Sequence, residues 1–196
     1  MRKRETTTDF IIELTSQRSI DKSENIWKNS PFGFLVPLTS DERGHWGEDY
    51  FQELSKTHTE FDVRWDGDFN TTPVDGTYDM KVKLYRTELK TAMKGTKSST
   101  WQHEVIKEAS KYDRLVFVDL VMSGIYITVI NNTDMVYGKK RHLIFEKKST
   151  PCKGGYKFDM SNATLRKGIA AGLTYYHDLE NINDVTLSTF LNKHFS

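Results

Sequence analysis

The stretch Tyr78–Lys90 reads YDMKVKLYRTELK, and it decides the fold of this chain. Apolar and polar residues alternate from Tyr78 to Leu84 and again from Thr87 to Thr91, with the period of two that is typical of half-buried strands. The pattern predicts two strands that pair antiparallel, with a turn near Tyr85 and Arg86. The fold is therefore expected to be built around this strand pair.

Three charged side chains are predicted to converge on this strand pair. Asp79 points away from the apolar side of the first strand, and Glu88 and Lys90 share one face of the second. Mg²⁺ prefers hard oxygen ligands and often binds one or two carboxylates together with water and substrate phosphate. The stretch therefore predicts a magnesium site, with Lys90 placed to hold the attacking water or to stabilise charge on phosphorus. A solvated strand face with a salt bridge is the alternative interpretation.

Upstream of this pair, the sequence predicts a helix and a strand. In the segment Gly44–His58, Trp46, Tyr50 and Leu54 lie on one helical face, which is typical of a helix packed on a core. The alternating apolar residues from Phe61 to Trp65 predict a short strand.

Downstream, a helix and two interior strands are predicted. A polar loop, Lys94–Thr100, leads to an expected helix over Trp101–Lys111, for which Thr100 is a suitable N-cap. The apolar runs Arg114–Val121 and Ile125–Ile130 are rich in β-branched residues, so they predict strands that are buried in a sheet.

The C-terminal third is also expected to be folded. The segments His142–Glu146 and Gly155–Phe158 are expected to be strands. Ser161 is the expected N-cap of a helix that continues toward Tyr176, and Val185–Phe195 is expected to form a short closing helix.

In the order of these elements, the chain resembles the PD-(D/E)xK nucleases, the restriction-endonuclease-like superfamily, from about Gly44 to Ile130. In that family an acidic residue on the first core helix, an Asp on the second strand and an (Asp/Glu)-x-Lys on the third strand surround one or two Mg²⁺ ions. The resemblance implies that the catalytic residues here are Glu48, Asp79, Glu88, Lys90 and Gln102, the last on the helix after the third strand. It also implies that Asp79, Glu88, Glu48 and the backbone carbonyl of Leu89 are the metal ligands.

Several positions in this resemblance have competitors. Tyr78 stands where the family's name-giving proline is expected, so Asp75 in the turn-like Val-Asp-Gly remains an alternative to Asp79. Asp49 competes with Glu48, although the two side chains point about 100° apart on a helix and only one can face the site. His103 is expected on the surface, with a phosphate or water contact as the alternative.

The resemblance implies an α/β fold with a restriction-endonuclease-like core, a central mixed β-sheet flanked by helices. We expect one nuclease domain over 1–196, with an N-terminal extension (1–43), a catalytic core (44–130) and C-terminal strands and helices (131–196). The implied activity is Mg²⁺-dependent cleavage of double-stranded DNA, with Mn²⁺ as a substitute. A type II restriction enzyme, acting as a homodimer on a palindromic site, fits best.

Two alternatives to restriction remain open. The first is a phage or mobile-element, repair or homing nuclease on the same core. The second is a non-catalytic DNA-binding module.

The charge distribution is compatible with a DNA partner. The formal net charge is only +1, but the segment from Lys139 to Lys167 is rich in Lys and Arg. A local basic surface binds phosphates even when the rest of the molecule is acidic. The candidate DNA contacts are Lys94, Lys97, Lys139, Lys140, Arg141 and Lys153.

Other classes of protein lack their sequence signals here. The single cysteine and six scattered histidines do not form a structural zinc motif, and the Gly-rich loop of a nucleotide-binding enzyme is missing. The beginning of the sequence has no apolar run like that of a signal peptide, and no segment is long and apolar enough for a membrane span. We therefore expect a cytoplasmic protein of a prokaryote or phage, with no membrane partner and no nucleotide cofactor.

Overall fold

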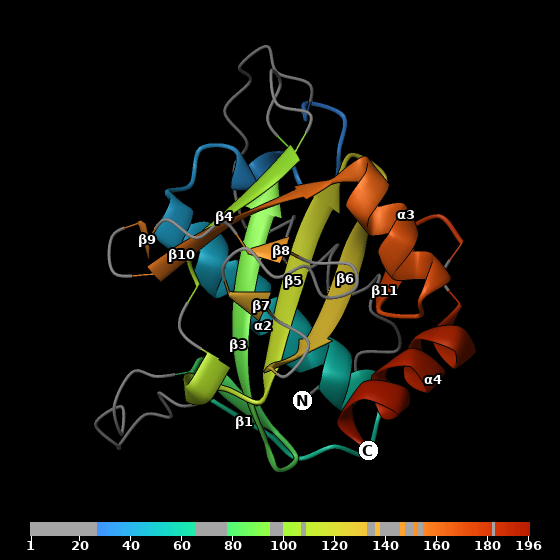
Figure 1. The fold of residues 1–196 in the computed structure, drawn as a ribbon. Coiled ribbons are helices and arrows are strands. Elements are labelled where there is room, and N and C mark those ends of the chain that lie inside the picture. The colour runs from blue at the N-terminus through green and yellow to red at the C-terminus, as the bar shows by residue number, and fades with distance from the viewer. Residues whose placement is uncertain are drawn as a thin grey trace.

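A six-stranded mixed sheet forms the centre of the molecule (Figure 1). The computed structural model describes residues 27–65, 78–94, 100–106, 109–132, 136–137, 146–147, 151–152, 155–181 and 183–196. The strand order is β1-β2-β3-β5-β6-β11, and all neighbouring pairs are antiparallel except β3 with β5, which are parallel. The strands are β1 (Val63–Trp65), β2 (Met80–Val82), β3 (Tyr85–Met93), β5 (Arg114–Val121), β6 (Gly124–Asn131) and β11 (Thr174–Asp178). The predicted α/β class with a central mixed sheet is thereby confirmed.

Two helices cover one face of this sheet, which we call the inner face. They are α2 (Ser40–His58) and α4 (Asp184–Phe195). The core between them and the sheet includes Tyr50, Phe51, Leu89, Val118 and Phe195. Because the buried residues of β5 and β6 occupy consecutive positions, both faces of the central strands are covered.

The opposite, outer face is covered partly by a second sheet. This three-stranded sheet has the order β4-β10-β9, with β4 (Thr100–Ile106), β10 (Gly155–Ser161) and β9 (Pro151–Cys152), and it crosses the upper part of the central sheet in Figure 1. Its core contacts include Trp101, Phe117 and Phe158, with helix α3 (Asn162–Ala170) adding Leu165. The remaining described elements are the 3₁₀ turns η1 (Gly33–Leu35) and η2 (Ala109–Lys111) and the short pair β7 (Val136–Tyr137) with β8 (Glu146–Lys147).

Most predicted elements have the expected type, with shifted ends. The first core helix begins earlier than Gly44, at Ser40, because Thr39 and Glu42 form a capping box. The hairpin turn lies at Lys83 and Leu84 instead of Tyr85 and Arg86, which already belong to β3. Of the C-terminal elements, the closing helix α4 and the strand β10 are confirmed.

The expected helix over Trp101–Lys111 is wrong, since this segment forms β4 and η2. Trp101 and His103 are buried while Gln102 and Glu104 are exposed, which is the alternation of a strand lying on the sheet. A register shift and a positive φ at Val105 then turn Ile106 inward. This bulge breaks the period of two, and burial against Phe117 and Phe158 outweighs the helix-favouring residues of the segment.

The helix expected from Ser161 toward Tyr176 is also only half right. Ser161 caps α3 as predicted, but the helix ends at Ala170. Gly172 has a φ of +66°, and Leu173 N donates to Gly168 O, which is the hydrogen bond of a glycine-terminated helix. The chain then continues as edge strand β11, because Thr174–Asp178 pairs with β6.

Part of the expected N-terminal extension is built into the core. Trp27, Phe32, Phe34 and Leu35 are buried in the inner-face core, where Phe32 and Phe34 contact the ring of Trp46 edge-on. The predicted strand His142–Glu146 lies almost wholly outside the described residues.

Candidate functional site

Asp79 lies directly before β2, at the point where β3 no longer has a paired strand on that edge. β2 pairs only with Tyr85–Thr87 of β3, and Asp79 N continues the ladder by donating to Thr87 O at 3.0 Å. One step further along β3, Leu89 N donates to Oδ2 of Asp79 at 2.7 Å. The carboxylate therefore takes the place of a strand partner beside Leu89. In an extended strand the N–H and C=O of one residue point to the same edge, so the Leu89 carbonyl opens toward Asp79.

Glu88 and Lys90 lie on the outer face of β3 as an ion pair. Residues at i and i+2 share a face in a strand, which brings Lys90 Nζ to 2.6 Å from Glu88 Oε1. The Glu88 side chain is fully buried, whereas 22% of the Lys90 side chain is exposed. The predicted Glu-x-Lys pair is thus an ion pair whose carboxylate is buried and whose lysine side chain is partly exposed.

Glu48 reaches the same region from α2 because the helix comes very close to β3. A Cβ atom at Gly47 would overlap the side chain of Thr91, so only glycine permits this approach. The next residue, Glu48, is therefore held near the open edge of β3. Its side chain is 16% exposed, and Oε2 lies 3.4 Å from Nδ1 of His45, one helical turn earlier.

The charges of the four groups influence the pKa values of Glu48 and Lys90. Burial raises the pKa of Glu48, and the charge of Asp79 raises it further against the lowering effects of His45 and Lys90. Burial by itself would lower the pKa of Lys90, but the carboxylates of Glu88, Asp79 and Glu48 outweigh it and raise the pKa above its ordinary value. Residues from α2, β3 and the start of β2 thus share one electrostatic environment.

The donor chemistry of this cluster fits a hard divalent cation. Glu48, Asp79 and Glu88 supply carboxylate oxygens, and Leu89 supplies a carbonyl oxygen on the same edge. Within the described ranges, no three His, Cys, Asp or Glu side chains are arranged as a closed metal-binding group. Instead, Asp79 accepts from the Leu89 amide and Glu88 pairs with Lys90.

Of the competing acids, Asp49 lies outside the cluster. It is exposed on α2, and its pKa is raised by burial and lowered by His45, with no contribution from Asp79 or Lys90. Asp75 lies outside the described residues.

Gln102 does not join the cluster. It lies on β4, with its side chain exposed on the face that points away from the central sheet.

His103 is buried, so the expectation of a surface histidine was wrong. Its Nε2 lies 2.9 Å from Oδ1 of Asp119 on β5, and both side chains are fully buried. Burial raises the pKa of Asp119, and the neighbouring His103 lowers it in part. This pair fastens the second sheet to the central one.

Among the candidate DNA contacts, Lys94 is described. Its Nζ lies over the ring of Trp101, 5.2 Å from the ring centroid. Lys97, Lys139, Lys140, Arg141 and Lys153 lie outside the described part of the chain.

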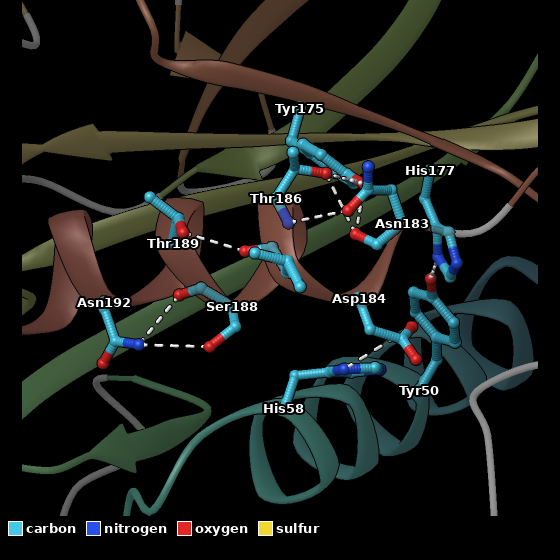
Figure 2. A network of polar contacts seen from close by, with 11 residues as sticks. Tyr50, His58, Tyr175, His177, Asn183, Asp184, Thr186, Ser188, Thr189 and Asn192 are labelled. Atoms are coloured by element: carbon cyan, nitrogen blue, oxygen red, sulfur yellow. Dashed lines mark hydrogen bonds and ion pairs between the residues drawn. The ribbon is translucent and has the colours of Figure 1, made fainter.

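Sequence reasoning missed His45 and a second polar cluster on α2. The i to i+3 spacing of His45 and Glu48 on a helix was a usable signal. Figure 2 shows the second cluster, in which Tyr50 and His58 of α2 face His177 of β11 and Asp184 of α4. No local sequence pattern signals it, because its members come from distant parts of the chain.

Short contacts hold this second cluster together. Tyr50 Oη is 2.7 Å from His177 Nδ1, and His58 Nδ1 is 3.8 Å from Asp184 Oδ1. Burial, together with the nearby charge of His58, lowers the pKa of His177 to about 4. A groove of about 590 Å³ opens beside His58, between Phe61 and Asn192, and the residues of the carboxylate cluster do not line it.

Comparison of the chain with protein-family models, with curated proteins and with solved structures gave no significant match. Among the described helices, none has a stretch long and apolar enough to cross a membrane.

Proposed function

We propose that this protein is a Mg²⁺-dependent endodeoxyribonuclease that cleaves double-stranded DNA. The observation that carries the proposal is the grouping of charged residues from separate elements around β3. Asp79 accepts from the Leu89 amide, Lys90 pairs with Glu88, and the close approach of α2 at Gly47 brings Glu48 to the same strand. A carboxylate cluster with one lysine is the combination that metal-assisted phosphodiester hydrolysis requires. The order in which α2, β2 and β3 contribute these residues is the order that the resemblance to the PD-(D/E)xK nucleases implies.

The resemblance implies a role for each of these residues. Asp79, Glu88 and the carbonyl of Leu89 would hold Mg²⁺, or Mn²⁺ in its place, and Glu48 would hold a second ion or a water of the first. When bound, the metal supplies Lewis-acid stabilisation of the negative charge that develops on phosphorus. The Lys90 ammonium, kept charged by its carboxylate neighbours, orients or activates the attacking water. In-line attack with departure of the 3′ oxygen leaves a 5′ phosphate, as the resemblance implies.

Within this class, a type II restriction enzyme is the form we propose. Symmetric cleavage of both strands of a palindromic site would require a homodimer, whose two-fold axis matches that of the site. A repair, homing or mobile-element nuclease would instead give cleavage that depends on ends, branches or a long asymmetric site.

The test is cleavage of mixed plasmid and phage DNAs in Mg²⁺ by the purified protein and its variants. Asp79→Ala, Glu88→Ala, Lys90→Ala and Glu48→Ala should each lower the cleavage rate by about a hundredfold or more. Asp49→Ala is the matched control, because Asp49 neighbours Glu48 on α2 but lies outside the cluster, and it should cleave like the unsubstituted protein.

Discrete fragments that disappear in the cluster variants would support a sequence-specific nuclease. Full activity of Asp79→Ala together with loss of activity in Asp75→Ala would show that Asp75, and not Asp79, is the aspartate that binds the metal. DNA binding without cleavage of duplex, single-stranded or branched substrates would contradict the proposal and favour the non-catalytic DNA-binding module.

A further inference from the structure

Four cations lie in line along the outer face of the β2–β3 hairpin, on either side of the carboxylate cluster. In β3 the residues Tyr85, Leu89 and Met93 pack into the inner-face core, so Arg86, Glu88, Lys90 and Ala92 point to the outer face. In β2, Met80 and Val82 pack inward, so Lys81 points outward, and it is the direct cross-strand partner of Arg86. We call Lys81, Arg86, Lys90 and Lys94 the β3 cation row.

The spacing of this row suits a chain of phosphates. Two residues advance about 6.6 Å along a strand, so Arg86, Lys90 and Lys94 follow each other at intervals of roughly 13 Å. That interval is close to the separation of every second phosphate along one nucleic-acid strand. Asp79 and Glu88 lie between Arg86 and Lys90, so the row extends in both directions from the carboxylates.

Two members of the row carry charge that no described carboxylate neutralises. Arg86 is held by Asp113 through two side-chain hydrogen bonds of 2.9 and 3.1 Å. No ion pair of Lys81 or Lys94 is found within the described ranges. Their Nζ atoms lie over aromatic rings, 6.0 Å from the centroid of Tyr78 and 5.2 Å from that of Trp101. Since Asp113 already neutralises Arg86, the charge of Lys81 on the neighbouring strand is the one left for an external anion on the hairpin side.

We propose that Lys81 and Lys94 bind the DNA phosphates on the two sides of the scissile phosphate, so that the cleaved strand runs along the outer face of β3. This inference rests on the proposed nuclease function and adds the path of the substrate strand. Lys81 and Arg86 contact the phosphates on the hairpin side, and Lys94 contacts those on the side of the second sheet. These contacts go to the backbone, so they set affinity and register without reading sequence.

The test measures the salt dependence of DNA binding in an Asp79→Ala background, where cleavage is suppressed. Lys81→Gln and Lys94→Gln should each reduce the slope of log K against log salt by about one, to a similar extent on unrelated duplexes. Lys56→Gln is the matched control, because Lys56 is an exposed lysine in the last turn of α2 and its replacement removes the same charge. Its slope should equal that of the parent protein.

A second measurement locates the contacts on the DNA. Replacing a phosphate next to the cleaved bond by an uncharged methylphosphonate should weaken binding of the parent protein several-fold and add little to the Lys81→Gln or Lys94→Gln defect. Slopes that are the same in the Lys81, Lys94 and Lys56 variants would overturn the strand path, while cleavage by the unsubstituted protein would leave the nuclease proposal in place. An unsubstituted protein that neither binds nor cleaves DNA would overturn both.

Discussion

At the scale of single residues, the ion pair between Glu88 and Lys90 has two roles that can be separated. Glu88 is a fully buried carboxylate, and Lys90 lies 2.6 Å from it. A buried charge that loses its partner is costly, whereas replacing both members by neutral groups is often nearly neutral. The pair therefore contributes to stability through neutralisation and, in the proposed mechanism, to catalysis through the charges themselves.

We predict that Lys90→Met lowers the free energy of unfolding by about 3 kcal/mol, because it leaves Glu88 buried without its ammonium partner. The double variant Lys90→Met with Glu88→Gln should recover most of this loss, as no buried charge remains. Both variants should fail to cleave DNA. Urea unfolding in EDTA measures the stabilities, and a double variant as unstable as the single one would show that the charge pair is not the source of the loss.

At the scale of elements, the contact of α2 with β3 decides whether Glu48 reaches the other carboxylates. The helix was predictable from its apolar stripe and its cap, and β5 and β6 from their long apolar runs. The strands β4 and β11 were not predictable in the same way. In β4 the bulge at Val105 hides the strand period, and in β11 the strand follows a helix with only Gly172 and its neighbours between them.

We predict that Gly47→Ala forces α2 away from β3, because the new methyl group would overlap Thr91. Such overpacking typically costs about 1 to 3 kcal/mol. It should also move Glu48 away from Asp79 and lower the cleavage rate more than the fall in stability explains at a temperature where the protein remains folded.

The matched control for Gly47→Ala is Gly44→Ala, one turn earlier on the same helix. A Cβ at Gly44 meets no atom within 4 Å, so this change should stabilise the helix by up to about 1 kcal/mol and leave cleavage unchanged. Thermal unfolding and the cleavage rate, measured for both variants, test the pair. Equal cleavage by the two variants would show that the close approach of α2 does not matter for the site.

At the scale of the whole molecule, contacts between buried ionisable side chains connect the second sheet and helix α2 to the central sheet. The His103–Asp119 pair links the second sheet to the central sheet, and the Tyr50–His177 contact links α2 to β11. The pKa values of Asp119 and His177 are shifted by burial between these layers, so their protonation is coupled to global unfolding.

We predict that stability falls as the pH is lowered from about 6.5 to about 4, in part through His177. Its pKa is lowered from the ordinary value of 6.5 to about 4 by burial, so the unfolded chain binds a proton across this window while the folded protein does not. The contribution of neutral His177 to the free energy of unfolding is fully present above pH 6.5 and is lost as the pH falls toward 4. The loss amounts to about 3 kcal/mol.

Urea unfolding of the unsubstituted protein and of His177→Gln, measured at several pH values, checks this prediction. The variant should be less stable at neutral pH and should show a flatter pH dependence between pH 6.5 and 4. Parallel pH profiles for the two proteins would assign the acid sensitivity to other groups, among them His58 and His194, whose pKa values burial also lowers.

The sequence by itself determined the hairpin, the first core helix, the interior strands and the placement of Glu88 and Lys90 on one strand face, because each depends on a local period or on neighbouring residues. Only the tertiary structure decided which of Glu48 and Asp49 faces the cluster, since that depends on the close packing of Gly47 against Thr91. The tertiary structure also decided that Trp101–Ile106 is a strand and that His103 is buried, because both follow from contacts with the central sheet. Local propensity sets what a segment can form, and burial against distant segments selects among those possibilities.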